Sequence, residues 1–181
     1  MERFCDLRLN EEAWSDDYEH SGKNGTLEDL VHAYEDNPES VYGWVRNRVT
    51  ETGNEVFIEY DEEEDDDPVA VGTDYFMGLF GDKAEKDIPI YRVIGLSSPN
   101  DLNKEDLGVC WTFNPKLLDN ITGEVVGDDQ DYYVRLYALA HSDNIDWWES
   151  LAWFTILGSE EAELRVIDPS RLSLKGYAVL E

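Results

Sequence analysis

The pattern of apolar residues changes near residue 87, and this change limits the fold more than any other feature of the chain. Before it, Thr26 provides a capping hydroxyl ahead of acidic residues and an apolar stripe, which predicts a helix, and residues 39–49 carry a second helical pattern. After it, runs of β-branched and aromatic residues predict strands. The predicted strands cover residues 88–94, 108–113, 132–138, 161–167 and 172–180, and one earlier strand is predicted at 55–60. We therefore predict an α+β fold, with helices first and a mixed or antiparallel β core second.

The same change divides the chain into two regions. Residues 1–86 form an acidic, partly helical N-terminal extension or lobe, and residues 87–181 form the predicted β core. The chain has 181 residues, of which 41% are hydrophobic, and this is enough to bury one core. We expect the two regions to form one compact unit, and the pattern leaves open whether the first region stands apart or wraps around the sheet.

Acidic residues outnumber basic ones by 42 to 14, which gives a formal net charge of −28. Residues 1–70 hold 22 acids and 5 bases, and Asp61–Asp67 is an unbroken run of seven acids. This balance argues against direct binding to nucleic acid or to an anionic membrane, because both would repel the chain. Three interpretations stay open. The protein binds basic partners, including by imitating nucleic acid; it is adapted to high salt; or its acidity only keeps it soluble.

The cysteines and the N-terminal sequence predict a cytoplasmic protein of a cell or of a host cell. Cys5 and Cys110 form neither a disulfide framework nor a Cys-x-x-Cys pair. The first six residues do not resemble a signal peptide, and no apolar run approaches the length of a membrane span. We predict no metal site, because the three histidines lack metal-ligand spacing and the acidic run does not fit an EF-hand loop.

Two acidic residues near the C-terminus are candidates for chemistry. Glu161 and Glu163 share one face of a predicted strand with Arg165, whereas the opposite face is apolar. Two carboxylates at this spacing repel each other unless each has a function or is in contact with water. The pair therefore indicates either a site or a solvated face.

Arg92 and Thr112 occupy the middle of two earlier predicted strands. Arg92 shares its face with isoleucines, where a guanidinium is costly unless a carboxylate or a phosphate meets it. A partly buried arginine–aspartate pair satisfies that requirement as well as a ligand does. Thr112 stands between Trp111 and Phe113, and taken alone it indicates a core strand whose hydroxyl bonds a neighbouring backbone group.

The order of these pieces resembles the arginine–serine–glutamate class of mono-ADP-ribosyltransferases. In that family one strand supplies an arginine, the next a Ser-Thr-Ser-like segment, and a late strand a Glu-x-Glu. The matching stretches are Ile90–Ile94, Gly108–Pro115 and Glu160–Val166, within about residues 87–181. Both serines of the family segment are replaced here, by Trp111 and Phe113.

The resemblance implies NAD as a substrate and a role for each matching residue. Arg92 would hold the NAD phosphates, Thr112 would brace the NAD cleft, and Trp111 could stack on the nicotinamide ring. Glu163 would hydrogen-bond the nicotinamide ribose and stabilise the positive charge that develops as nicotinamide leaves. Glu161 would orient or deprotonate the acceptor.

Two functions follow from these observations. The sequence predicts an NAD-dependent mono-ADP-ribosyltransferase of phage or effector type that modifies a basic protein target. The tryptophan-rich residues 146–159 would then be the loop that meets this target. The alternative is a non-catalytic acidic DNA mimic that inhibits a nucleic-acid-binding protein, as an anti-restriction or anti-defence protein does.

Overall fold

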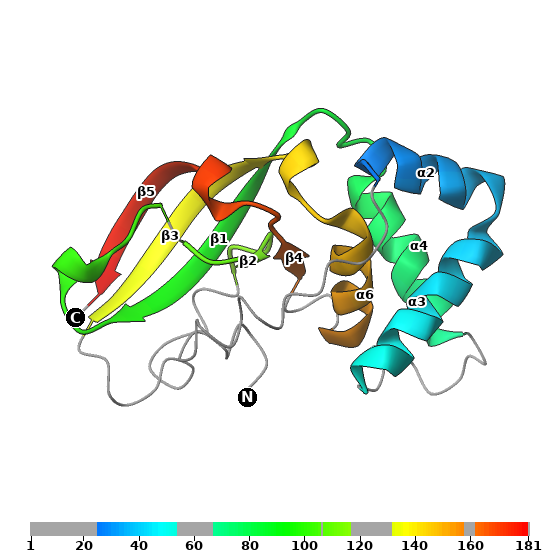
Figure 1. Ribbon diagram of the computed structural model, residues 1–181, viewed down its shortest axis with the longest axis horizontal. Helices are drawn as coiled ribbons and strands as arrows, with labels where there is room; N and C mark the ends of the chain where they lie inside the picture. Colours follow the sequence, from blue (N-terminus) through cyan, green and yellow to red (C-terminus); the bar gives the residue numbers. More distant parts are fainter. Residues whose placement is uncertain (1–24, 54–66, 106, 117–131, 158–161, 181) are drawn as a thin grey trace.

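The structure of the protein, a computed structural model, describes residues 25–53, 67–105, 107–116, 132–157 and 162–180 (Figure 1). The helices of this part are α2 (Leu27–Asp36), α3 (Pro38–Thr52), α4 (Pro68–Phe80) and α6 (Trp147–Leu157). The strands are β1 (Asp87–Leu96), β2 (Cys110–Thr112), β3 (Tyr132–His141), β4 (Glu163–Arg165) and β5 (Ser173–Leu180). The predicted strand at 55–60 lies outside the described residues.

The strands form one antiparallel sheet in the order β4-β2-β1-β3-β5. The longest ladder joins β1 to β3, from Asp87 opposite His141 to Leu96 opposite Tyr132. At the other side of β1 the sheet continues through β2 and β4, each only three residues long. This arrangement of helices and an antiparallel sheet confirms the predicted α+β class.

The helix ends follow local chemistry. The Thr26 hydroxyl accepts from the Asp29 amide at 3.3 Å, which confirms the predicted cap of α2, and the Asp29 carboxylate accepts from the Thr26 amide at 2.8 Å, which completes a capping box. Helix α4, which the sequence pattern did not predict, begins after Asp67, whose carboxylate accepts from the Val69 amide. No helix in the described residues combines the length and the apolar composition that crossing a bilayer requires.

One hydrophobic cluster joins the helices to a face of the sheet. The strands contribute alternate residues, as strand geometry requires, and the helices cover them with aromatic rings. Its fully or nearly fully buried members include Phe76, Ile88, Ile90, Leu136, Ala138, Trp147, Phe154 and Leu164. Residues on both sides of position 86 therefore share one core.

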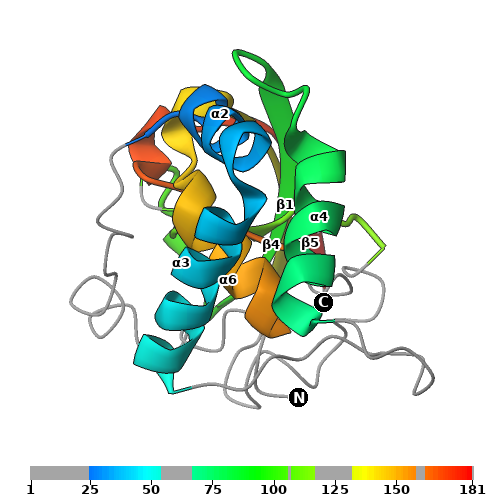
Figure 2. The same cartoon turned by 90° about the vertical axis from the view of Figure 1, so that its right-hand side faces the viewer.

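The tryptophan-rich segment is a buried helix, which corrects the expectation that residues 146–159 form a loop facing a target protein. Helix α6 packs against β4 and lies between α3 and α4 (Figure 2). Trp147 and Leu151 are fully buried, and the Trp147 indole donates to the Ser142 carbonyl at 2.7 Å. The segment is apolar on nearly all sides because helices and sheet surround it.

Candidate functional site

The three strands that carry the predicted site residues lie side by side. Arg92 is in β1, Thr112 in β2 and Glu163 in β4. Thr112 is the direct partner of Tyr91 on one side and of Glu163 on the other. Paired residues of neighbouring strands share a face, so Thr112 and Glu163 project together, whereas alternation turns Arg92 toward the opposite face.

Glu163 is buried in an ion pair. Glu163 is 1% exposed, and its carboxylate Oε1 lies 2.7 Å from Nε of Arg165. Burial raises the pKa of the Glu163 carboxyl, while Arg165, a hydrogen bond from Cys110 and the charge of Arg92 act in the opposite direction. The carboxylate is therefore within electrostatic reach of Arg92 but is held by its own strand neighbour.

Arg92 is 4% exposed and packs against the backbone of Gly108. A Cβ built on Gly108 would lie 2.5 Å from Cζ and 2.7 Å from Nη2 of Arg92, so only glycine leaves room for the guanidinium. Within the described residues Nε of Arg92 has no hydrogen-bond partner. The predicted buried arginine–aspartate pair does not occur in this part of the chain, and the nearby carboxylate is Glu163.

Trp111 and Thr112 make contacts that a core strand needs. Trp111 is fully buried, and its indole donates to the Gly108 carbonyl at 2.8 Å. The Thr112 hydroxyl accepts from the Asn114 amide at 3.0 Å and lies 3.4 Å from the Ala162 carbonyl. These bonds match the simpler interpretation of a core strand, in which the hydroxyl forms hydrogen bonds with neighbouring backbone groups.

The Glu-x-Glu segment is only partly visible. Glu161 lies outside the described residues, and β4 begins at Glu163 because Ala162 has a φ of 48°, which ends the extended run. On the described side, Cζ of Arg165 stands 4.5 Å from the centre of the Trp153 ring in α6. Arg165 therefore links Glu163 to the helix that covers β4.

A different feature of the described residues is open to a partner. Five exposed carboxylates lie on α2 and at the start of α3, and we name them the α2–α3 acidic surface: Glu28, Asp29, Glu35, Asp36 and Glu39. The basic residues of α3 are already engaged elsewhere. Arg46 forms an ion pair with Asp67, and Arg48 forms one with Glu149 at 2.8 Å.

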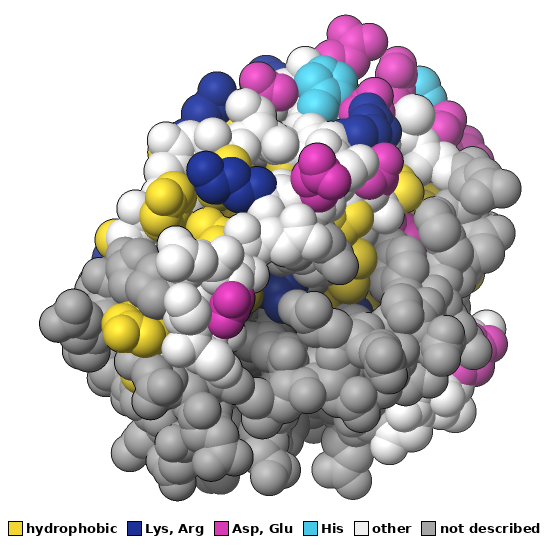
Figure 3. All heavy atoms as spheres, turned by 60° about the vertical axis from the view of Figure 1, so that its left-hand side comes forward, with side chains coloured by type: hydrophobic (Ala, Val, Ile, Leu, Met, Phe, Trp, Pro, Cys, Tyr) yellow, Lys and Arg dark blue, Asp and Glu magenta, His cyan; other side chains and the backbone are white. Residues whose placement is uncertain are grey.

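Charge is distributed unevenly over the described residues. Residues 25–53 and 67–80 hold eight acids and two bases, whereas the described residues from 81 onward hold ten acids and nine bases. Figure 3 faces the sheet end, where lysine and arginine side chains lie among acidic and apolar ones. Among the described residues, the part that holds α2, α3 and α4 is thus strongly negative, and the part that holds α6 and the sheet is nearly neutral. The sequence signal was the acid excess in residues 1–70, which did not specify these five positions.

Among the described residues no group of three or more histidine, cysteine or acidic side chains is arranged to hold a metal ion. Comparison with protein-family models, with curated proteins and with solved structures finds no match to the chain.

Proposed function

We propose that the protein binds a basic surface of a nucleic-acid-binding partner as a non-catalytic DNA mimic, and that the α2–α3 acidic surface contributes to this contact. One observation carries the proposal: five exposed carboxylates occur within α2 and the first turn of α3, and the arginines of α3 pair with other acids. Within the described residues, Arg46 and Arg48 therefore do not form ion pairs with these five carboxylates.

Electrostatics explains how such a surface would compete with DNA. A nucleic-acid groove is lined by lysine and arginine spaced to meet phosphates, which follow one another every ~1.7 Å along a duplex axis. A fixed array of carboxylates meets the same cations and speeds their encounter. The affinity of this contact depends on salt, because ions screen exposed charges beyond about 8 Å at physiological ionic strength.

The geometry of the predicted catalytic residues supports binding over catalysis. Glu163 is 1% exposed and in contact with Arg165, and Trp111 is fully buried. A dinucleotide needs access to its clamp and to its carboxylate at the same time. The acidic surface needs only exposure, which its five residues have.

The test is competition with DNA. A fluorescent duplex is bound to each of a panel of DNA-binding proteins, including restriction endonucleases, and the purified protein is titrated in. We expect release of the duplex from at least one panel member, with a midpoint that rises steeply between 50 and 200 mM salt. No release from any member, or a midpoint insensitive to salt, would remove the proposal.

Matched variants assign the effect to the surface. The triple variant Glu35→Gln, Asp36→Asn and Glu39→Gln removes three charges from it. The control variant Asp87→Asn, Asp101→Asn and Glu105→Gln removes three exposed charges from the sheet side. Each exposed ionic contact contributes ~0.5 kcal/mol, so losing three of them weakens binding about tenfold. We therefore expect the first variant to compete about tenfold more weakly and the control to change little. Equal losses in both would mean that only net charge matters.

NAD-dependent ADP-ribosyl transfer is the second candidate function. The observation in its favour is the adjacency of β1, β2 and β4, which brings the charge of Arg92 within reach of Glu163. Labelled NAD is incubated with a cell extract and either the wild type or Glu163→Gln, after thermal melts have established that both are folded. A labelled protein band that disappears in the variant supports transfer. Absence of label together with absence of nicotinamide release rejects it.

A further inference from the structure

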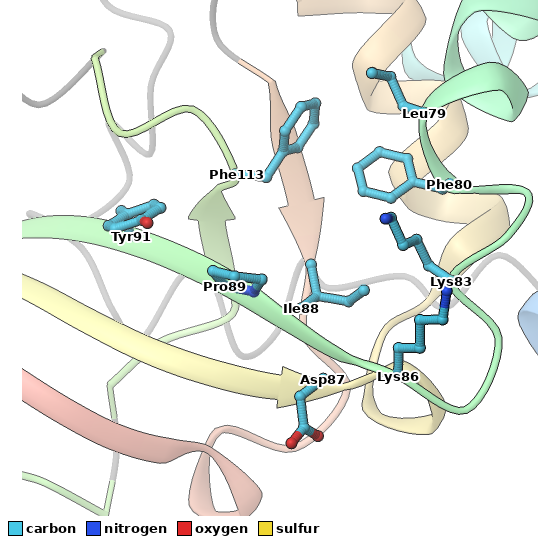
Figure 4. A pocket seen from close by; sticks show the side chains of 9 residues that line it. All are labelled: Leu79, Phe80, Lys83, Lys86, Asp87, Ile88, Pro89, Tyr91 and Phe113. Atoms are coloured by element: carbon cyan, nitrogen blue, oxygen red, sulfur yellow. The ribbon is translucent and has the colours of Figure 1, made fainter.

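A cavity of about 360 Å³ lies between the C-terminal end of α4, the start of β1 and the residue that follows β2 (Figure 4). Its volume is at the lower end of the range of small-molecule sites, about 300–1,000 Å³. It is separate from the α2–α3 acidic surface and from Glu163. Neither proposed function uses it.

Aromatic and aliphatic side chains form the walls of this cavity. The Phe80 and Phe113 rings meet edge to face, with centroids 4.8 Å apart and planes at 90°. Tyr91 stacks on Tyr137 at 5.3 Å, which fixes the orientation of the Tyr91 ring. These walls favour a planar apolar group, because aromatic rings pack well in stacked and edge-to-face arrangements.

Two lysines stand at the same cavity. Lys83 and Lys86 both line it, and in Figure 4 the Lys83 ammonium points to the space beside the Phe80 ring. The turn that carries the lysines is ordered by backbone bonds, in which the Lys83 amide donates to the Phe80 carbonyl and the Ser142 amide donates to the Lys86 carbonyl, both at 2.9 Å. Two cations beside an apolar pocket are unexpected in a chain of net charge −28.

The acidic neighbours of the lysines leave them able to bind a ligand. Asp82 lies 3.7 Å from Nζ of Lys83 and 4.0 Å from Nζ of Lys86, and its side chain is 73% exposed. Contacts of this length at an exposed carboxylate are weak. Asp87 also lines the cavity, but its carboxylate points away from the other side chains (Figure 4).

From this combination we propose that the cavity binds a small aromatic carboxylate, whose ring lies against the cavity wall that Phe80, Phe113 and Tyr91 line and whose carboxylate meets Lys83 and Lys86. Apolar walls with a few convergent polar groups are the usual composition of a small-molecule site. The charge of the lysines favours an anionic ligand, and the aromatic walls favour a ligand with an aromatic ring. The inference is independent of the proposed function, since it uses other residues.

The probe for the test is 2-naphthoate, titrated into isotopically labelled protein and followed by the backbone amide shifts in NMR spectra. 2-Naphthalenemethanol, which has the same rings without the charge, is the comparison ligand. We expect 2-naphthoate to shift amides of residues 79–91 and 113 and to bind about tenfold more tightly than the alcohol, with an affinity that falls as salt is added.

Matched variants complete the test. We expect Lys83→Gln with Lys86→Gln to weaken 2-naphthoate binding about tenfold, to the level of the alcohol. Lys104→Gln with Lys175→Gln removes two exposed cations elsewhere and should leave binding unchanged. Shifts confined to other residues, equal affinity for the two ligands, or equal losses in the two variants would each overturn the proposal. Competition with DNA is measured separately, so either proposal can fail without the other.

Discussion

Replacing Gly108 by alanine probes the buried arginine most selectively. Gly108 has a φ of 77°, in the left-handed region that residues with a side chain rarely adopt. A Cβ at this position would overlap the Arg92 guanidinium, at 2.5 Å from Cζ and closer still to Nη1. Arg92 would have to leave its place on the core face of β1.

The expected magnitude has two parts. Forcing alanine into a left-handed conformation costs roughly 1–2 kcal/mol. Overpacking a buried site adds typically 1–3 kcal/mol. We therefore expect Gly108→Ala to lower the free energy of unfolding by about 2–5 kcal/mol. Gly53 provides the matched control, because its φ is 71° and no atom lies within 4 Å of a Cβ built on it. Gly53→Ala should therefore cost only the roughly 1–2 kcal/mol of backbone strain.

Urea denaturation of the wild type and both variants, followed by tryptophan fluorescence, measures the difference. Comparing Gly108→Ala in the wild type with Gly108→Ala in an Arg92→Ala background separates the overlap from the backbone strain. Without the Arg92 guanidinium the glycine substitution should cost less, because only the backbone strain remains. Equal destabilisation by Gly108→Ala and Gly53→Ala would refute the packing of Arg92 against Gly108.

Three further predictions concern capping and titration. Thr26→Ala removes the capping hydroxyl of α2 and should cost ~1 kcal/mol in urea denaturation. Burial raises the pKa of Glu163, so the contribution of this group to stability falls as the pH rises above about 4.5. The stability of the wild type relative to Glu163→Gln should therefore decline as the pH rises above that value. A difference that grows with pH would contradict the burial of this carboxyl. A hydrogen bond with His141 and the charge of Arg171 lower the pKa of Asp143, so this group stabilises the fold above about pH 4 and loses its effect as the pH falls through the lowered pKa. Acid titration of Asp143→Asn should therefore show a smaller loss of stability than the wild type.

The parts of the fold that could be predicted from sequence are those fixed by local patterns. The sequence predicts that Thr26 caps a helix with acids in its first turn, and in the structure it caps α2 and forms a capping box with Asp29. Strands β1, β3 and β5 follow runs of β-branched and aromatic residues, and β3 extends three residues beyond its predicted end to His141. The helix predicted at 39–49 runs from Pro38 to Thr52, where proline takes the first helical turn.

The parts that could not be predicted depend on what surrounds them. Helices α4 and α6 are apolar on most sides, so neither has the one-sided pattern that marks a helix at a surface. The extent of β4 depends on the left-handed conformation of Ala162, a residue with no intrinsic preference for it. These features follow from packing between segments far apart in the chain.

For the candidate site, too, local patterns could be predicted from the sequence and packing between distant segments could not. Alternation correctly placed Glu163 with Arg165, and Arg92 with the isoleucines of its strand. Burial of Glu163 could not be read from the strand, because it depends on the pairing of β4 with β2 about 50 residues earlier and on α6. The cavity at Lys83 and Lys86 is lined by residues 79–91 together with Phe113 from a later segment, and no motif in the sequence marked this pairing.

Displacement of DNA by the purified protein is the decisive measurement for binding by the α2–α3 acidic surface. At 50 mM salt we expect the wild type to release a fluorescent duplex from a member of the panel of DNA-binding proteins. We expect the variant Glu35→Gln, Asp36→Asn and Glu39→Gln to need about ten times the concentration. A wild type that leaves every duplex bound, or a variant that competes as well as the wild type, would contradict the assignment of binding to the α2–α3 acidic surface.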